Sequence, residues 1–200
     1  MNEPLQLIIL ISGNGSNLQA IIDAIAQDQL PARICLVISN RADAFGLTRA
    51  RQAGIPTEIL LHADYSQREA YDRALRETID RYLDPTQKSL IVLAGFMRIL
   101  SPEFVAHYCG RIINIHPSLL PKYPGLHTHE RVLEAGDREH GTTVHLVTED
   151  LDAGPILGQR KLDVRPDDTP ETLQARVHAL EHELYPEVIR HFCKDLPSDL

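Results

Sequence analysis

Asn114, His116 and Asp152 are the side chains in this sequence best suited to catalysis. The apolar stretch 111–113 precedes Asn114 and is typical of the end of a strand. Side chains in a strand alternate between faces, so Asn114 and His116 are expected to point the same way. Pro117 has no N–H and ends the strand there. In open α/β sheets, ligands bind at the carboxyl ends of the strands.

Asp152 lies in a second segment, the short acidic turn 148–155. If this turn returns to the strand end, Asp152 would orient the imidazole of His116 and favour its charged form. Asn114 and a protonated His116 would then stabilise a developing oxyanion, and His116 would pass on a proton. This chemistry suits transfer of an acyl-like group. The simpler alternatives are a hydrogen-bonded Asn–His pair and a turn carboxylate bonded to its own backbone.

A glycine-rich segment, 12–17 (Ser-Gly-Asn-Gly-Ser-Asn), separates the first predicted strand from the first predicted helix. Glycines let the backbone approach a ligand closely, and a helix N-terminus presents free N–H groups to an anion. The spacing matches neither the dinucleotide fingerprint nor the P-loop. The segment therefore predicts a phosphate site, with a capped strand-to-helix turn as the alternative.

Other segments allow more than one interpretation from spacing alone. His178 to His182 matches the H-x-x-E-H zinc pattern and 127–129 is H-x-H, but a metal site needs three or four converging ligands. The helix at 178–182 can equally be surface or line a polar ligand. Spacing favours core packing for the loop 95–101 and a solvated surface charge for Arg68.

Apolar runs alternate with helical patterns through the first half of the chain, which predicts an α/β fold with a mostly parallel sheet covered by helices on both faces. The second half is expected to contain two strands, 142–147 and 156–164, around the acidic turn, and then a long helix. Thr169 is the expected cap of that helix, with Pro170 at its first position.

Composition restricts the class of protein. The 200 residues have a net charge of −8, which argues against nucleic acid as a partner. The three cysteines form no disulfide framework, so a reducing compartment is expected. We recognise no signal peptide and no apolar stretch of about 20 residues. The sequence thus predicts a cytoplasmic protein that acts on small molecules, away from membranes.

Four segments together resemble the phosphoribosylglycinamide formyltransferase family. They are Ile11–Ala20 (ISGNGSNLQA), Ala94–Ser101 (AGFMRILS), Asn114–Pro121 (NIHPSLLP) and Glu149–Pro155 (EDLDAGP). The resemblance covers nearly all of residues 5–192. It implies one formyltransferase domain over 1–200, with a Rossmann-like phosphate-binding half (1–116) and a smaller strand-and-helix half (117–200) that completes the folate and catalytic site.

The resemblance also implies roles at matching positions. It implies direct attack of the glycinamide amine on 10-formyltetrahydrofolate, the co-substrate, without a metal, in a monomer or weak homodimer. The implied catalytic residues are Asn114, His116 and Asp152. The implied ribonucleotide site is Gly15, Ser16, Asn17, His178, Ala179, Leu180 and Glu181. The implied folate site is Arg68, Met97, Arg98, Ile99, Leu100, Asn114, Thr148, Glu149, Asp150, Leu151 and Asp152.

Three alternatives are weaker. A formyl-folate deformylase of this family is expected to have an extra N-terminal domain before the first strand, whereas the first strand here is expected to start at Leu5. A methionyl-tRNA formyltransferase is expected to have an added C-terminal domain and basic charge. A catalytically silent phosphometabolite-binding protein would need the glycine-rich turn but not Asn114, His116 and Asp152 together.

Overall fold

The apolar runs of the first half form five parallel strands in the computed structural model, which describes residues 3–195. Every residue of β1 and β4 is buried, as expected for strands with helices on both faces. The five strands are β1 (Leu5–Ile11), β2 (Ala32–Ser39), β3 (Thr57–Ile59), β4 (Ser89–Leu93) and β5 (Ile112–His116).

Two antiparallel strands, β6 (Glu139–Leu146) and β7 (Ile156–Asp163), extend the same sheet in the order β3-β2-β1-β4-β5-β6-β7. The strand β6 pairs with β5 and sets Asn114 opposite His145 and His116 opposite Thr143. The two halves predicted from the sequence therefore share one sheet, and the boundary at residue 116 falls at the end of β5.

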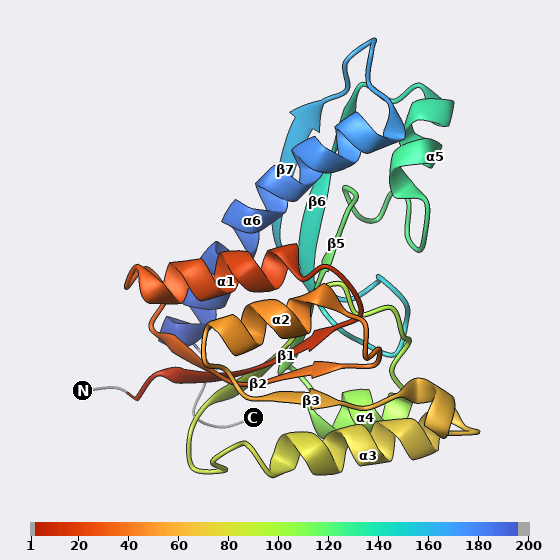
Figure 1. Cartoon of the computed structure of the whole chain (residues 1–200). Helices are drawn as coiled ribbons and strands as arrows, with labels where there is room; N and C mark the ends of the chain where they lie inside the picture. Colours follow the sequence, from red (N-terminus) through yellow and green to blue (C-terminus); the bar gives the residue numbers. More distant parts are fainter. Residues whose placement is uncertain (1–2, 196–200) are drawn as a thin grey trace.

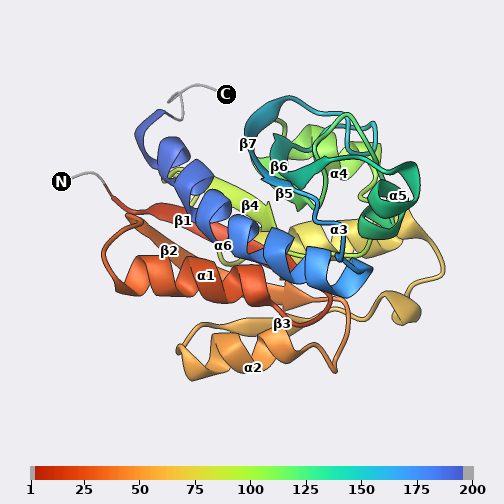
Figure 2. The same cartoon turned by 90° about the horizontal axis from the view of Figure 1, so that it is seen from above.

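Helices cover both faces of the sheet (Figures 1 and 2). On one face lie α1 (Ser16–Ala26), α2 (Phe45–Gln52) and the long α6 (Pro170–Asp195). On the other face lie α3 (Arg68–Asp80) and α4 (Pro102–His107), while α5 (Thr128–Ala135) contacts α6 at the β6–β7 end. A short 3-10 helix, η1 (His62–Asp64), precedes α3.

Each face has its own hydrophobic core. Leu18 of α1 and Leu184 of α6 pack on one face of the sheet, and Leu75 of α3 and Phe104 of α4 pack on the other. Tyr185 is fully buried, and its one hydroxyl hydrogen is shared between Leu93 O at 2.8 Å and Ile113 O at 3.2 Å, which ties α6 to the end of β4 and to β5 next to Asn114. The long C-terminal helix is therefore anchored beside the strand ends that carry the candidate catalytic residues.

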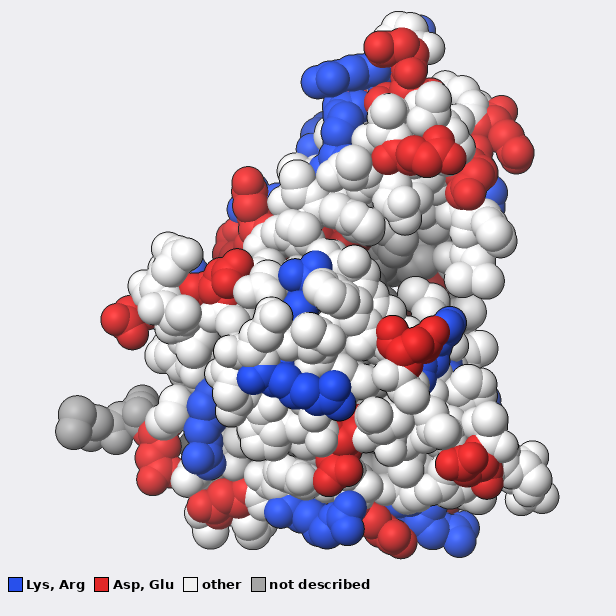
Figure 3. All heavy atoms as spheres, in the orientation of Figure 1, with Lys and Arg blue, Asp and Glu red and all other residues white. Residues whose placement is uncertain are grey.

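The predicted fold class is confirmed, including the start of α6 at Pro170, where Thr172 N donates to the Thr169 hydroxyl. Within residues 3–195, no helix is long and apolar enough to cross a membrane. On the face shown in Figure 3, acidic and basic side chains are interspersed rather than gathered in a region of one sign.

Candidate active site

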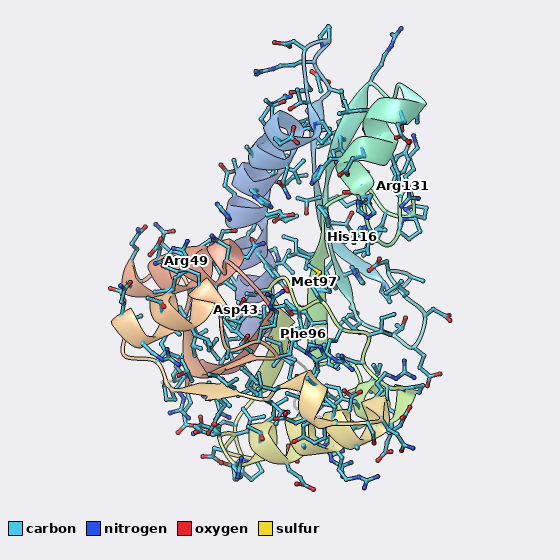
Figure 4. The ribbon with its side chains drawn as sticks, turned by 45° about the vertical axis from the view of Figure 1, so that its right-hand side comes forward. Asp43, Arg49, Phe96, Met97, His116 and Arg131 are labelled. Carbon is cyan, nitrogen blue, oxygen red and sulfur yellow. The ribbon has the colours of Figure 1, made fainter. Side chains whose placement is uncertain are left out.

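A cavity of about 600 Å³ lies at the carboxyl ends of β4 and β5. It joins the loop after β4, the end of β5, the start of α5 and the acidic turn between β6 and β7. Asn114, His116 and Asp152 all line it, so the three predicted catalytic side chains share one cavity. In Figure 4, His116 and Met97 lie between the part of the molecule that holds α1 and α2 and the part that holds α5.

Both ring nitrogens of His116 face oxygen atoms. Nε2 lies 2.9 Å from the carbonyl oxygen of Tyr123, and Nδ1 lies 3.4 Å from Oδ2 of Asp152. The side chains of His116 and Asp152 are 7% and 8% exposed. A carbonyl oxygen can only accept, so Nε2 carries a hydrogen in this arrangement. Nδ1 is then the nitrogen that can gain or lose a proton next to a carboxylate.

Asp152 is held in place by its surroundings rather than by its own turn. Its backbone has φ 52°, a left-handed conformation that is unfavourable for a non-glycine residue. Gly125 N donates to its Oδ2 at 2.8 Å. The turn returns close to β6 because position 154 is glycine: an added Cβ there would lie 1.8 Å from Leu146 O. The bond from Gly125 joins the Asp152 carboxylate to the loop before α5. The simpler interpretation, a carboxylate bonded within its own turn, does not account for this bond.

His145 is a site residue that sequence reasoning missed. Its Nδ1 lies 2.9 Å from Leu146 O and therefore carries a hydrogen, which leaves Nε2 to accept from Asn114 Nδ2 at 3.3 Å. Burial lowers the pKa of His145, although the Leu146 carbonyl and the charge of Asp152 oppose that effect. A neutral His145 thus holds one amide hydrogen of Asn114 and leaves the other for a ligand. Its signal was its position directly opposite Asn114 in the antiparallel register.

The glycine-rich turn lies at the N-terminus of α1 and is packed against α2. Gly15 has φ 74°, and a Cβ added to it would lie 2.7 Å from the Cα of Gly46. Gly46 N donates to Gly13 O at 3.0 Å, and Arg49 donates from Nε and Nη2 to the backbone and side-chain oxygens of Asn14. The backbone around Ser16 is therefore fixed by close packing, with the free N–H groups of α1 at its end.

Asn17 connects this turn to α6. Its Nδ2 donates to Glu181 Oε2 at 2.8 Å, and its Oδ1 has no hydrogen-bond partner among the residues that the structure describes. Both residues are buried, at 8% and 4% exposed, and burial raises the pKa of Glu181 while the bond from Asn17 lowers it. The structure thus brings together two segments, 15–17 and 178–181, that were predicted to bind the same ligand.

The H-x-x-E-H segment is arranged differently from a metal site. The rings of His178 and His182 stack with their centres 6.3 Å apart, and Glu181 turns toward Asn17. In the chain from residue 3 to residue 195, no group of three or more His, Cys, Asp or Glu side chains is placed to hold a metal ion.

The loop after β4 corrects the core interpretation of its apolar residues. Phe96 and Leu100 are buried, but Met97 and Ile99 are 69% and 55% exposed. Exposed Met97 and Ile99 belong to the cavity lining together with Leu126 and Leu151, which are also exposed. This rim is typical of a site that binds the apolar part of a ligand.

The predicted folate residues divide into two groups. Arg98 and the whole acidic segment 148–152 line the cavity, and the guanidinium of Arg98 lies over the ring of Tyr71 at 4.9 Å. Arg68 lies outside the set of described residues that line this cavity, and its Nε is 3.6 Å from Glu69. Ser12, in the loop after β1, contacts the loops after β4 and β2, since its hydroxyl accepts from Met97 N and donates to Asn40 Oδ1.

Comparison with known proteins gives one consistent result. A family model described as formyl transferase matches residues 5–189. Phosphoribosylglycinamide formyltransferase of Escherichia coli is 56% identical over 94% of this chain and 87% of its own, and that of Haemophilus influenzae is 49% identical over 94% and 86%.

Solved structures agree with the sequence relatives. A phosphoribosylglycinamide formyltransferase from Coxiella burnetii is 61% identical, with a TM-score of 0.89 over 96% of this chain and 88% of that chain. A glycinamide ribonucleotide transformylase from Symbiobacterium toebii is 44% identical, with a TM-score of 0.92 over 97% and 90%. The chain therefore belongs to the formyl transferase family and, within it, to the phosphoribosylglycinamide formyltransferases, which are folate-dependent enzymes.

Proposed function

We propose that the protein transfers the formyl group of 10-formyltetrahydrofolate to the glycinamide amine of 5′-phosphoribosylglycinamide. The products are formylglycinamide ribonucleotide and tetrahydrofolate, in de novo purine synthesis. The relatives from E. coli and H. influenzae support this reaction by name. The cavity that joins Asn114, His116 and Asp152 supports it by chemistry.

The ribonucleotide is proposed to bind between α1 and α6. Gly15, Ser16 and Asn17 would hold its phosphate, because the α1 N-terminus offers unpaired backbone N–H groups and a positive dipole end. The segment 178–181 would contact the remainder of the nucleotide. The contact between Asn17 and Glu181 supports this arrangement, since it joins both segments in one buried pair.

The folate is proposed to bind in the cavity between the loop 97–100 and the turn 148–152. The exposed apolar side chains of Met97 and Ile99 suit the ring system of a folate. Arg68 stays part of the proposed folate site as a residue at its outer edge. No metal and no covalent enzyme intermediate belong to this proposal.

In the proposed reaction, the glycinamide nitrogen attacks the formyl carbon and a C–N bond forms as the carbonyl oxygen becomes negative. Asn114 Nδ2 would donate to that oxygen through the hydrogen that His145 does not hold. The positive charge of a protonated His116 would stabilise the same oxygen. The tetrahedral intermediate then expels the folate nitrogen, which gains the proton that the attacking amine loses.

His116 Nδ1 is the proposed site of proton transfer. Nε2 is directed at Tyr123 O, whereas Nδ1 faces Asp152 at 3.4 Å, a separation that a substrate group or water can shorten. Asp152 would hold the charged ring and help to move the proton, directly or through water. The proposed mechanism rests most directly on one observation: His116 Nδ1 faces the Asp152 carboxylate in the same cavity that Asn114 lines.

An absorbance assay of folate turnover tests the proposal. We expect tetrahydrofolate to form from 10-formyltetrahydrofolate only when phosphoribosylglycinamide is present. Turnover at the same rate without the nucleotide would instead identify a deformylase. The cytoplasmic location, the monomer or weak homodimer, and the division into halves at residue 116 are further parts of the proposal.

A further inference from the structure

The loop 122–126 contacts both proposed proton-transfer residues through its backbone. The carbonyl oxygen of Tyr123 accepts from His116 Nε2 at 2.9 Å, and the N–H of Gly125 donates to Asp152 Oδ2 at 2.8 Å. One contact fixes the plane of the ring and the other fixes the carboxylate that faces it. The position of this short loop therefore sets the geometry of the pair.

The loop has little regular structure of its own to keep it in place. It lies between the end of β5 and the start of α5, outside any helix or strand. Tyr123 has φ 55°, a conformation that costs a non-glycine residue roughly 1–2 kcal/mol. Such a conformation persists only where neighbouring groups hold it.

Two side chains hold the loop from the α5 side. Arg131, on α5, donates from Nη1 to Pro124 O at 2.6 Å and to Leu126 O at 3.3 Å, and its guanidinium lies 5.3 Å from the centre of the Tyr123 ring. Asp137, just after α5, accepts through Oδ2 from Lys122 Nζ at 2.9 Å and from the Tyr123 hydroxyl at 3.0 Å. Together they hold the loop at Lys122, Tyr123, Pro124 and Leu126.

We propose that Arg131 and Asp137, the loop clamp, are positioning residues that hold Tyr123 O against His116 and Gly125 N–H against Asp152. This inference rests on the proposed roles of His116 and Asp152 in formyl transfer. Arg131 and His116 lie on the same side of the molecule in Figure 4. The clamp acts through backbone groups, so the substrates need not touch either residue.

The clamp is charged at neutral pH. The hydrogen bonds from Lys122 and Tyr123 lower the pKa of Asp137, and the bond to Asp137 raises the pKa of Lys122. Because the carboxyl pKa is lowered in the folded state, this contact stabilises the fold at pH values above the ordinary pKa of an aspartate. That stabilisation is lost as the pH falls through the pKa of the folded state.

The test compares Arg131→Gln with Arg131→Lys, and uses Arg73→Gln, an exposed position on α3, as a matched control. We expect Arg131→Gln to lower kcat roughly 10- to 100-fold, because a misplaced catalytic group can cost that much. The KM values for both substrates should change less, and Arg131→Lys or added guanidinium should restore part of kcat. Arg73→Gln should match the wild type.

A second readout reports on the ring itself. In ¹⁵N-edited spectra, we expect the Nε2–H proton of His116 to exchange slowly with water in the wild type, because the group is buried and bonded to Tyr123 O. In Arg131→Gln that exchange should become faster. If Arg131→Gln does not fold, Tyr123→Phe, which removes only the hydroxyl bound to Asp137, provides the same comparison with a smaller fall in kcat.

A folded Arg131→Gln with kcat within twofold of the wild type and an unchanged His116 signal would overturn the inference. So would an equal fall in Arg73→Gln. Failure of the proposed function is distinguishable, because it would show in the wild-type protein as no nucleotide-dependent formation of tetrahydrofolate, whatever the clamp variants do.

Discussion

The two ends of the candidate site are built in different ways. The end proposed to bind phosphate is formed by the regular elements β1, α1, α2 and α6, and Gly15 lies against Gly46 with no room for a side chain. The proposed catalytic end joins the ends of β5 and β6 to loops, and both Asp152 and Tyr123 have left-handed backbones without being glycine. The first end is fixed by steric packing, while the second depends on individual hydrogen bonds to main-chain groups.

This difference matches the proposed task of each end. A phosphate needs a fixed set of N–H donors, which a packed strand-to-helix turn supplies. Proton transfer needs groups whose spacing can change during the reaction, and His116 Nδ1 and Asp152 Oδ2 are 3.4 Å apart. Substitutions at the catalytic end should therefore affect kcat, and those at the phosphate end should affect nucleotide binding and stability.

The largest effect is expected for His116→Ala. Loss of a residue that both carries charge and transfers a proton should lower kcat roughly 10²- to 10⁴-fold. The KM for the ribonucleotide should change little, because its proposed contacts lie at the other end. Steady-state kinetics with each substrate varied in turn would measure both values, and a kcat near that of the wild type would refute the role.

Gly15→Ala should have the next largest effect, at the opposite end. The left-handed conformation alone costs an alanine roughly 1–2 kcal/mol, and the new Cβ would lie 2.7 Å from Gly46 Cα. We expect a lower unfolding temperature. We also expect the KM for the ribonucleotide to rise more than the KM for the folate.

Gly54→Ala is the matched control for this effect. Gly54 has φ 71°, similar to Gly15, but an added Cβ there would meet no described atom within 4 Å. It should show the conformational cost without the nucleotide defect. Equal effects of the two substitutions would argue against the close packing of α1 and α2 as the cause.

The smallest effect concerns pH and the catalytic end. Burial is the main cause that lowers the pKa of His129, His140 and His145, and His140 reaches about 4 from an ordinary 6.5. The unfolded chain then binds more protons between pH 6.5 and 4, so stability falls as the pH falls through that window. For His140 the loss from pH 7 to 5 is on the order of 1 kcal/mol.

Urea unfolding at both pH values measures this loss. His140→Gln should reduce the difference in unfolding free energy between pH 7 and pH 5, because the buried ring that resists protonation is gone. His191→Gln, at an exposed position on α6, is the surface control. A pH dependence that is the same in all three proteins would contradict the assignment.

Local patterns in the sequence were enough to predict the fold and to place the glycine-rich turn between its first strand and its first helix. The strands, the covering helices and the glycine-rich turn follow from apolar runs, alternation and short motifs. Asn114 and His116 are two residues apart on one strand, so their shared direction was also predictable. The acidic turn was proposed to return Asp152 to the strand end, and in the structure its carboxylate lies 3.4 Å from His116 Nδ1.

The remaining contacts depend on tertiary structure. His145 is a site residue only because antiparallel pairing sets it opposite Asn114, and no short motif marks it. Tyr123 acts through its carbonyl oxygen and Gly125 through its N–H, groups that nearly all residue types have, so no motif marked these contacts. From spacing alone, Met97 and Ile99 were interpreted as core, because apolar composition does not distinguish a buried side chain from a ligand-facing one. Only the family resemblance assigned them to a ligand site.

The most direct test of the central claim is a double-mutant cycle on kcat with His116→Ala, Asp152→Asn and the pair together. If the imidazole and the carboxylate act as one unit, the double variant should be about as slow as the slower single variant. If the two losses multiply instead, the residues act independently, and the account of a joint proton-transfer pair at the end of β5 is contradicted.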